Sequence, residues 1–148
     1  MHIKIYTPYL LLLLLFKTSH SSSLSTTKEV PLYIRQSWIK RTDSIRTACI
    51  CESNAKPSDA YKLLMLTQVT NDPCLKCFIK CLKIKLNLMD ATTGNLIEKE
   101  FIRQIEGVTP EIFKKCNEKV REEIDLCEKS FGMFLCVVHV LAVPKTTE

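Results

Sequence analysis

The chain has 148 residues, 46% of them hydrophobic, and a formal net charge of +5. This length indicates one domain rather than two. The charge is small and the basic residues alternate with acidic ones, whereas nucleic-acid-binding proteins concentrate Lys and Arg on one face, so no nucleic-acid partner is expected.

Residues 1–23 are predicted to be a secretory signal peptide. Lys4 precedes an unbroken apolar run from Leu10 to Phe16, and small polar residues follow before Leu24. This is the layout of a cleavable leader. The apolar run is far below the roughly 20 residues that span a bilayer, which disfavours a membrane anchor, and no membrane insertion is expected. Cleavage would leave residues 24–148 as one secreted, extracellular domain with a charge of +3.

Apolar residues at helical spacing predict helices along the first half of this domain. One is expected from Pro31 to about Cys49, and a short one after a cap at Ser58 and Asp59. A third begins at Asp72-Pro73, where a capping side chain precedes a proline. Its apolar stripe is Leu75, Phe78, Ile79, Leu82 and Leu86, and its solvated side is predicted to carry Lys76, Lys80 and Lys83.

The second half is predicted to contain a turn at residues 90–95 and three more helices. The first covers Leu96–Glu106, and the second starts at Thr109-Pro110, again a cap before a proline. Its inward residues are expected to be Ile112, Phe113, Cys116, Val120 and Ile124. The last helix, from about Leu126, is apolar nearly all round, which indicates that it is buried or folds over an apolar molecule. The predicted fold class is all-α, a compact bundle of about six helices.

Eight cysteines follow the predicted leader: Cys49, Cys51, Cys74, Cys77, Cys81, Cys116, Cys127 and Cys136. An even number in a small exported chain is typical of a disulfide framework. Cys74, Cys77 and Cys81 share one helix face, so each is expected to bridge to a different neighbour. Short cysteine gaps also occur in metal and cluster sites, but an oxidising compartment disfavours free thiolates. No metal or other cofactor is expected.

The cysteine spacing resembles that of a known family. The run Cys77-x3-Cys81-x34-Cys116-x10-Cys127-x8-Cys136, with a further cysteine 27 or 25 residues upstream, is similar to the six-cysteine pattern of insect odorant-binding proteins, the pheromone-binding and general odorant-binding group. The x3 and x8 gaps are the characteristic ones. The segment from Cys49 to Asn54 is also similar to a stretch common in that family. The resemblance covers the chain from about Leu32 to Val140.

The family's disulfide pairing, carried over by this resemblance, implies Cys49–Cys81, Cys77–Cys127 and Cys116–Cys136. The two remaining cysteines, Cys51 and Cys74, are predicted to form a fourth bridge. An extended segment at Cys49–Cys51 would reach two positions on one face of the third helix. The roles of Cys49 and Cys51 can be exchanged without violating the spacing.

The resemblance also implies an internal apolar cavity for a small hydrophobic ligand. The side chains expected to line it are Leu66, Phe78, Ile79, Leu82, Phe101, Phe113, Met133, Phe134, Val137 and Val138. For each of these, core packing is an interpretation of equal weight. The segment from Val138 to Val143 is expected to fold back over the cavity mouth. Tyr61, Thr67 and Ser130 are candidates for polar groups that orient the ligand.

The function implied by the resemblance is that of a secreted carrier that binds and solubilises odorants, pheromones or related lipophiles. A membrane receptor, olfactory or other, is a further expected partner, and the carrier is expected to be a monomer or homodimer. Any release of ligand by acid is expected to involve tail carboxylates such as Glu148 as much as His139.

Two other classes of function are weighed against the carrier. An enzyme is not expected, because the chain lacks a Gly-x-Ser-x-Gly nucleophile motif and His139 has no Asp close by in the sequence. The main alternative is a secreted, disulfide-rich helical interaction protein, either cytokine-like or a venom component. Exposed aromatic anchors would favour the interaction protein, whereas an empty apolar cavity would favour the carrier.

Overall fold

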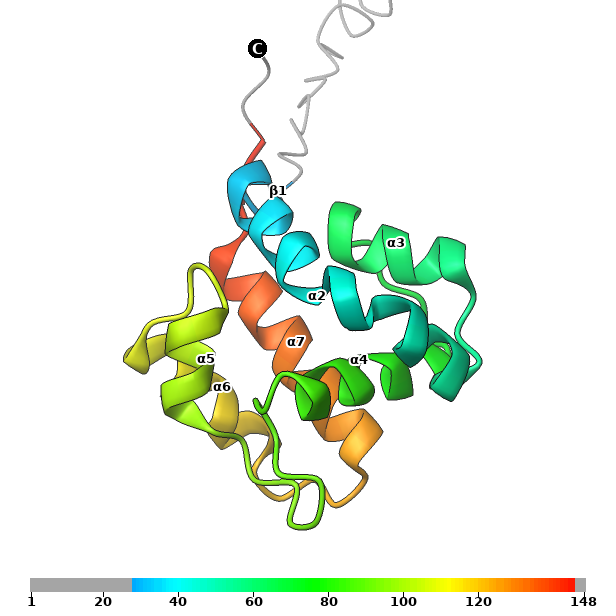
Figure 1. Cartoon of the computed structure of the whole chain (residues 1–148). Helices are drawn as coiled ribbons and strands as arrows, with labels where there is room; N and C mark the ends of the chain where they lie inside the picture. The colour runs from blue at the N-terminus through cyan, green and yellow to red at the C-terminus, as the bar shows by residue number, and fades with distance from the viewer. Residues whose placement is uncertain (1–27, 146–148) are drawn as a thin grey trace, which may run out of the picture.

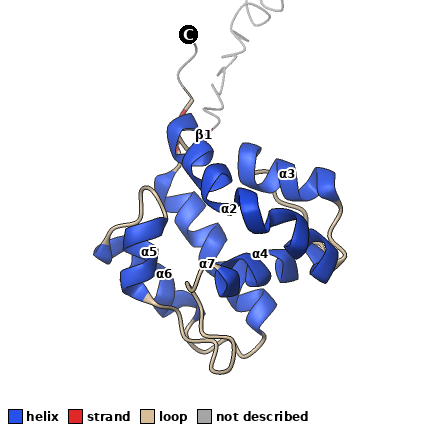
Figure 2. Cartoon of the chain, viewed as in Figure 1, coloured by secondary structure: helices blue, strands red, loops and turns tan. Residues whose placement is uncertain are grey.

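The computed structural model describes residues 28–145, so the predicted signal peptide lies outside the described residues. The described part contains six α-helices and one pair of two-residue strands, and it has the all-α fold that the sequence predicts (Figures 1 and 2). In chain order these elements are β1 (Lys28–Glu29), α2 (Leu32–Ser53), α3 (Pro57–Leu66), α4 (Pro73–Lys85), α5 (Glu98–Gln104), α6 (Pro110–Val120), α7 (Leu126–Leu141) and β2 (Val143–Pro144). None of these helices is long and apolar enough to cross a membrane.

Local capping decides where several helices begin. Asp72 accepts backbone hydrogen bonds from Cys74 at 2.7 Å and Leu75 at 3.1 Å, with Pro73 as the first residue of α4. Thr109 accepts one from Ile112 at the start of α6. Both predicted caps are confirmed. The predicted cap at Ser58 and Asp59 is wrong, because α3 begins at Pro57, which supplies the helical backbone angle without any side-chain cap.

Helix α7 lies at the centre of the bundle (Figure 1). It packs against α4 and α6, while α4 also packs against α2, α2 against α3, and α5 against α6. This arrangement creates two cores. The first core lies between the start of α2 and helices α5, α6 and α7. The second lies between the rest of α2, helices α3 and α4, and Phe131 of α7. Phe134 of α7 packs against both cores, which explains why this helix is apolar nearly all round.

The two ends of the described chain meet in a short antiparallel strand pair, in which Glu29 is opposite Val143. The prediction that the segment from Val138 to Val143 folds back over a cavity mouth is wrong. Val138 belongs to α7, which continues to Leu141, and the backbone of Val143 is occupied by pairing with β1. The segment therefore holds the N-terminal end of the domain.

Three disulfides join the packed helices. Cys49–Cys81 connects α2 to α4, Cys77–Cys127 connects α4 to the first turn of α7, and Cys116–Cys136 connects α6 to α7. The Cα–Cα distances are 5.5, 4.5 and 5.5 Å respectively. These are the three pairs that the family resemblance implies.

The predicted fourth bridge between Cys51 and Cys74 is absent, and both residues are free thiols. The prediction assumed that the helix ends near Cys49, but α2 continues to Ser53. Residues two apart on a helix are rotated by about 200° around the helix axis, so their side chains point to nearly opposite sides. Cys49 is fully buried against α4, so Cys51 points into solvent and is exposed.

Ile124, predicted to lie inside, is 91% exposed. Helix α6 ends at Val120, so the helical spacing that would bring Ile124 inward no longer applies.

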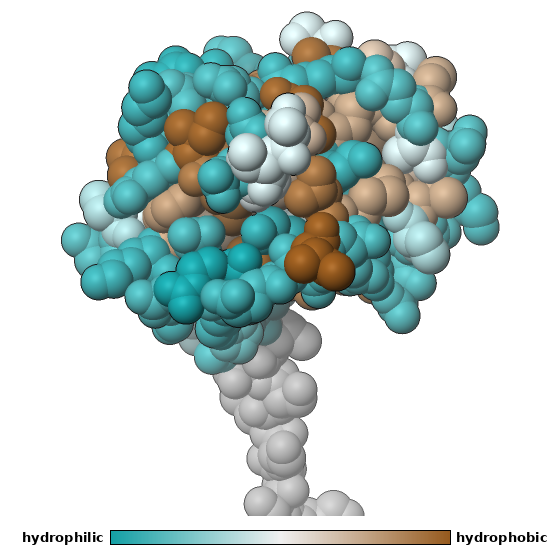
Figure 3. Space-filling view, turned by 90° about the horizontal axis from the view of Figure 1, so that it is seen from below, coloured by the Kyte–Doolittle hydropathy of each residue, from teal (hydrophilic) through white to brown (hydrophobic). Residues whose placement is uncertain are grey.

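On the face of the molecule that is seen from below, hydrophobic residues form small groups separated by hydrophilic ones (Figure 3).

Candidate ligand-binding site

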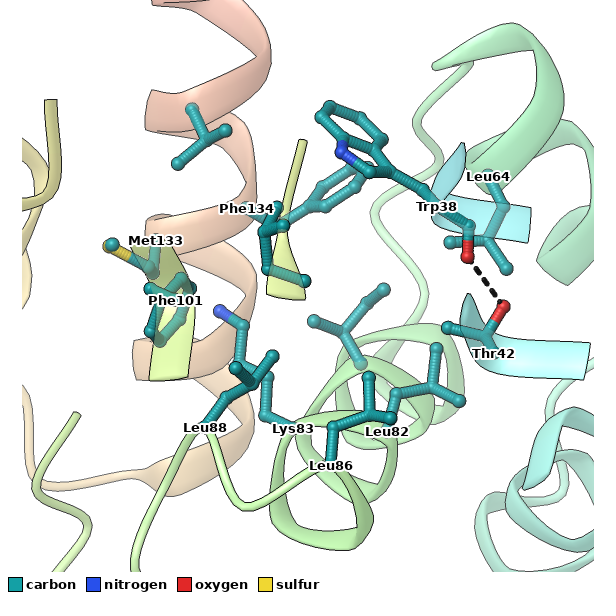
Figure 4. Close-up of a pocket in the computed structure, with 13 residues that line it drawn as sticks. Trp38, Thr42, Leu64, Leu82, Lys83, Leu86, Leu88, Phe101, Met133 and Phe134 are labelled. Atoms are coloured by element: carbon teal, nitrogen blue, oxygen red, sulfur yellow. Dashed lines mark hydrogen bonds between the residues drawn. The ribbon is translucent and has the colours of Figure 1, made fainter. Parts of the chain in front are cut away.

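An apolar cavity of about 70 Å³ lies where the two cores meet (Figure 4). Helices α2, α3, α4, α5 and α7 and the segments that follow α4 and α5 contribute its walls. Eleven of the thirteen lining side chains are hydrophobic, and Thr42 and Lys83 are the two polar ones. The lining residues are Trp38, Thr42, Leu64, Ile79, Leu82, Lys83, Leu86, Leu88, Phe101, Ile105, Met133, Phe134 and Val137.

Six of the ten residues predicted to face a ligand line this cavity: Ile79, Leu82, Phe101, Met133, Phe134 and Val137. They come from the three helices α4, α5 and α7. Helix α4 packs directly against α7, and α5 packs against α6, which in turn packs against α7. Their contact with a ligand stays a prediction.

The other four predicted residues lie outside the cavity lining. Phe78 is fully buried in the second core, as Ile79 is, but its side chain is rotated by about 100° around the helix from that of Ile79 and does not line the cavity. Phe113 packs behind Phe101, with ring centres 5.3 Å apart. Leu66, at the end of α3, is 42% exposed, and Val138 is half-buried against the first core.

Seven lining residues were not predicted: Trp38, Thr42, Leu64, Lys83, Leu86, Leu88 and Ile105. Leu86 belongs to the apolar stripe predicted for the third helix, and Trp38, Leu64 and Ile105 are apolar residues of other predicted helices. Helical periodicity shows that such residues face inward, but it does not show which cavity they reach. Leu88 lies in the segment after α4, where no helical pattern applies.

Trp38 and Thr42 satisfy their polar groups within the protein. The indole Nε1 of Trp38 donates to the backbone oxygen of Glu106 at 3.0 Å, and its ring meets Phe134 edge-on, with ring centres 6.1 Å apart. The Thr42 hydroxyl donates to the backbone oxygen of Trp38 at 3.0 Å. Both residues therefore present mainly apolar surface to the cavity (Figure 4).

Lys83 is the exceptional residue of the site, because its side chain is only 6% exposed. Its Nζ donates to the backbone oxygen of Ser130 at 2.5 Å and lies 5.5 Å from the centre of the Phe101 ring. Burial lowers the pKa of Lys83 from its ordinary 10.5 to about 7. The prediction that Lys83 faces solvent is wrong: Ile79, Lys83 and Leu86 are spaced i, i+4 and i+7, which places the lysine on the apolar stripe.

The three residues predicted to orient a ligand do not line the cavity. Tyr61 is exposed, and Thr67 follows the last turn of α3. Ser130 is fully buried, with its hydroxyl 3.5 Å from the sulfur of Met89, and contributes only its backbone oxygen, which accepts from Lys83. His139 is exposed on α7, and Glu148 lies outside the described residues.

Comparison with known proteins identifies the family. The model of the PBP/GOBP family matches residues 35–139, which include helices α3 to α6, most of α2 and α7, and all three disulfides. General odorant-binding protein 57c of Drosophila melanogaster is 32% identical over 100 residues, covering 62% of this chain and 66% of that protein, so the chain spans about two thirds of its relative's length. No solved structure matches the chain significantly. The chain therefore belongs to the PBP/GOBP family, the pheromone-binding and general odorant-binding proteins of insects.

Proposed function

We propose that this protein is a secreted carrier that takes up a small hydrophobic molecule into the cavity between its two cores. The main support is that eleven of the thirteen side chains lining the cavity are hydrophobic. In addition, Trp38 and Thr42 donate their hydrogen bonds to backbone oxygens of the protein. Transfer of apolar surface from water into such a site is favourable by about 25 cal/mol per Å². The odorant-binding relative and the predicted signal peptide support the same function.

The cavity volume favours a compact ligand. Its 70 Å³ is well below the roughly 300–1,000 Å³ of sites for drug-sized molecules. A larger ligand requires side chains to move, and Met133 is suited to this because an unbranched thioether adapts to irregular shapes. We therefore expect small volatile or short-chain ligands to bind more tightly than long-chain lipids.

The alternative of an interaction protein rests on surface residues. Tyr33 and Tyr61 are 64% and 54% exposed, and such aromatic residues can anchor a partner. The small, separated apolar groups of Figure 3 do not form a broad hydrophobic face on that side of the molecule. The cavity thus favours the carrier over the interaction protein.

Trp38 provides a direct test, because it is the chain's sole tryptophan and lines the cavity. A ligand that enters should change the tryptophan emission saturably, and the same ligand should displace a fluorescent apolar probe such as N-phenylnaphthylamine. The oxidised, leader-free protein should show one-site binding in the micromolar range. Absence of saturable binding in a helical, correctly bridged sample would overturn the carrier function.

A substitution that fills the cavity sharpens this test. Val137 is buried and lines the cavity, so Val137→Phe should weaken probe binding about tenfold or more, because the added ring occupies ligand space. Ile124→Phe, at a fully solvated position, is the matched control and should bind as the wild type does. Circular dichroism and thermal melting would verify that both variants fold. Equal binding by the two variants would place the ligand elsewhere.

A further inference from the structure

We propose that the cavity selects ligands with a carboxylate head and an apolar tail, and that the ammonium group of Lys83 is the residue that pairs with this head. The inference rests on the proposed carrier function and specifies its ligand class. It starts from the fact that one lining side chain out of thirteen carries a titratable group.

Lys83 is buried without a counter-charge. The ion pairs among residues 28–145 engage other lysines and arginines, and none of them includes Lys83. The Nζ atom has a single hydrogen-bond acceptor in the described part of the chain, the Ser130 backbone oxygen, although an ammonium group has three N–H donors. The Phe101 ring supplies a weak electrostatic contact at 5.5 Å. Hydrogen-bonding capacity and positive charge are thus left for a ligand.

This arrangement explains the low pKa of Lys83 and what would reverse it. Burial lowers the pKa to about 7 in the empty protein, because removal from water disfavours the charged form and no carboxylate among residues 28–145 pairs with the ammonium group. A carboxylate entering the cavity would supply the missing opposite charge in a water-poor setting, where such an attraction is stronger than in water. Pairing therefore favours the ammonium form and raises the pKa, and above neutral pH binding takes up a proton from solvent.

The rest of the cavity fits the tail of such a ligand. In Figure 4 the nitrogen of Lys83 lies beside Phe101, whereas Trp38, Thr42 and Leu64 lie on the opposite side of the cavity. A molecule with its head at Lys83 would therefore extend its tail toward Trp38. The small volume restricts the tail to a short or folded chain.

The test compares three ligands that share one chain: heptanoate, its methyl ester and heptanol. Heptanoate should bind the wild-type protein about tenfold more tightly than the ester or the alcohol, the effect of one charge-assisted hydrogen bond. Lys83→Met should abolish this preference while the two neutral ligands bind as before. Lys80→Met, a change of equal charge on the same helix and outside the cavity lining, should retain the preference.

The outcomes separate this inference from the carrier function. Equal affinity of the wild type for acid, ester and alcohol would overturn the role of Lys83 and leave the carrier function standing. If Lys83→Met retained the preference for the acid, the role of Lys83 would likewise be overturned. If Lys80→Met lost the preference, the preference would come from surface charge rather than from Lys83. Failure of all three ligands and of the apolar probe to bind would overturn the carrier function itself. The comparison among ligands on the wild type needs no variant to fold.

Discussion

Arg35 in the first turn of α2 donates a hydrogen bond from Nη1 to the backbone oxygen of Met65, 2.5 Å away in the last turn of α3. Its Nε also donates to the backbone oxygen of Val30 at 2.7 Å, and its other nitrogen lies 3.7 Å from Glu29. One buried guanidinium thus holds the N-terminal segment, α2 and α3 together.

Replacement of Arg35 by alanine should therefore lower the free energy of unfolding by about 2–4 kcal/mol, because two backbone oxygens lose a charged donor. Arg41→Ala, at an exposed position of the same helix, should change it by less than about 0.5 kcal/mol. Urea unfolding of the oxidised proteins measures both. A similar small effect for both variants would show that Arg35 is not a structural link.

The free thiols of Cys51 and Cys74 should differ in reactivity. Cys51 is exposed and should react with iodoacetamide in the native protein, whereas the half-buried Cys74 should react more slowly. Under denaturing, non-reducing conditions, mass spectrometry should show two labels in total. Recovery of a cross-linked peptide pair containing Cys51 and Cys74, with no label, would show that the fourth bridge forms after all.

Burial of Lys83 makes stability depend on pH. Its pKa is about 7 in the folded protein and 10.5 when solvated, so between these values the unfolded chain binds more protons and stability rises with pH. Below about pH 7 both states are protonated and the penalty is constant. Lys83→Met should therefore stabilise the ligand-free protein at neutral pH, by about 1–4 kcal/mol.

The advantage of Lys83→Met should shrink as the pH rises from about 7 toward about 10. Urea unfolding at several pH values measures this difference, with Lys80→Met as the control that should show no such trend. A difference between Lys83→Met and the wild type that stays constant with pH would mean that the amine is solvated.

Asp125 caps α7 and should give the opposite pH dependence. Backbone hydrogen bonds from Glu128 at 3.0 Å and Cys127 at 2.7 Å lower the pKa of this carboxyl. Its stabilising effect is present above the ordinary aspartate pKa of about 3.9 and is lost as the pH falls through the lower folded value. Asp125→Ala should lower the melting temperature at neutral pH, and less in acid.

Asp125→Asn is the matched variant, because asparagine also caps a helix but carries no charge. It should melt close to the wild type at neutral pH and lose the acid dependence attributable to this position. If Asp125→Asn and Asp125→Ala melt alike at every pH, the hydrogen bonds of the cap do not stabilise α7.

Sequence alone determined the features that depend on near neighbours and on spacing. The caps at Asp72 and Thr109 act within a single helical turn, so a few consecutive residues suffice to predict them. The apolar periodicity predicted the helices. The cysteine spacing indicated the family, and the family's disulfide pairing then predicted the three bridges. Six of the ten predicted ligand-facing residues line the cavity because they lie on inward helix faces.

Only the tertiary structure decided which inward residues share a cavity and which polar residues are buried. Phe78 and Ile79 are both buried in the second core, but helix packing brings only Ile79 to the cavity wall. The continuation of α2 past Cys49 left Cys51 in solvent, and the loop at Ile124 exposed a residue that periodicity placed inside. Lys83 is buried because Phe101 of α5 and Ser130 of α7 contact it on that side of α4. Such burial depends on contacts between segments that are distant in the sequence, and helical periodicity does not encode these contacts.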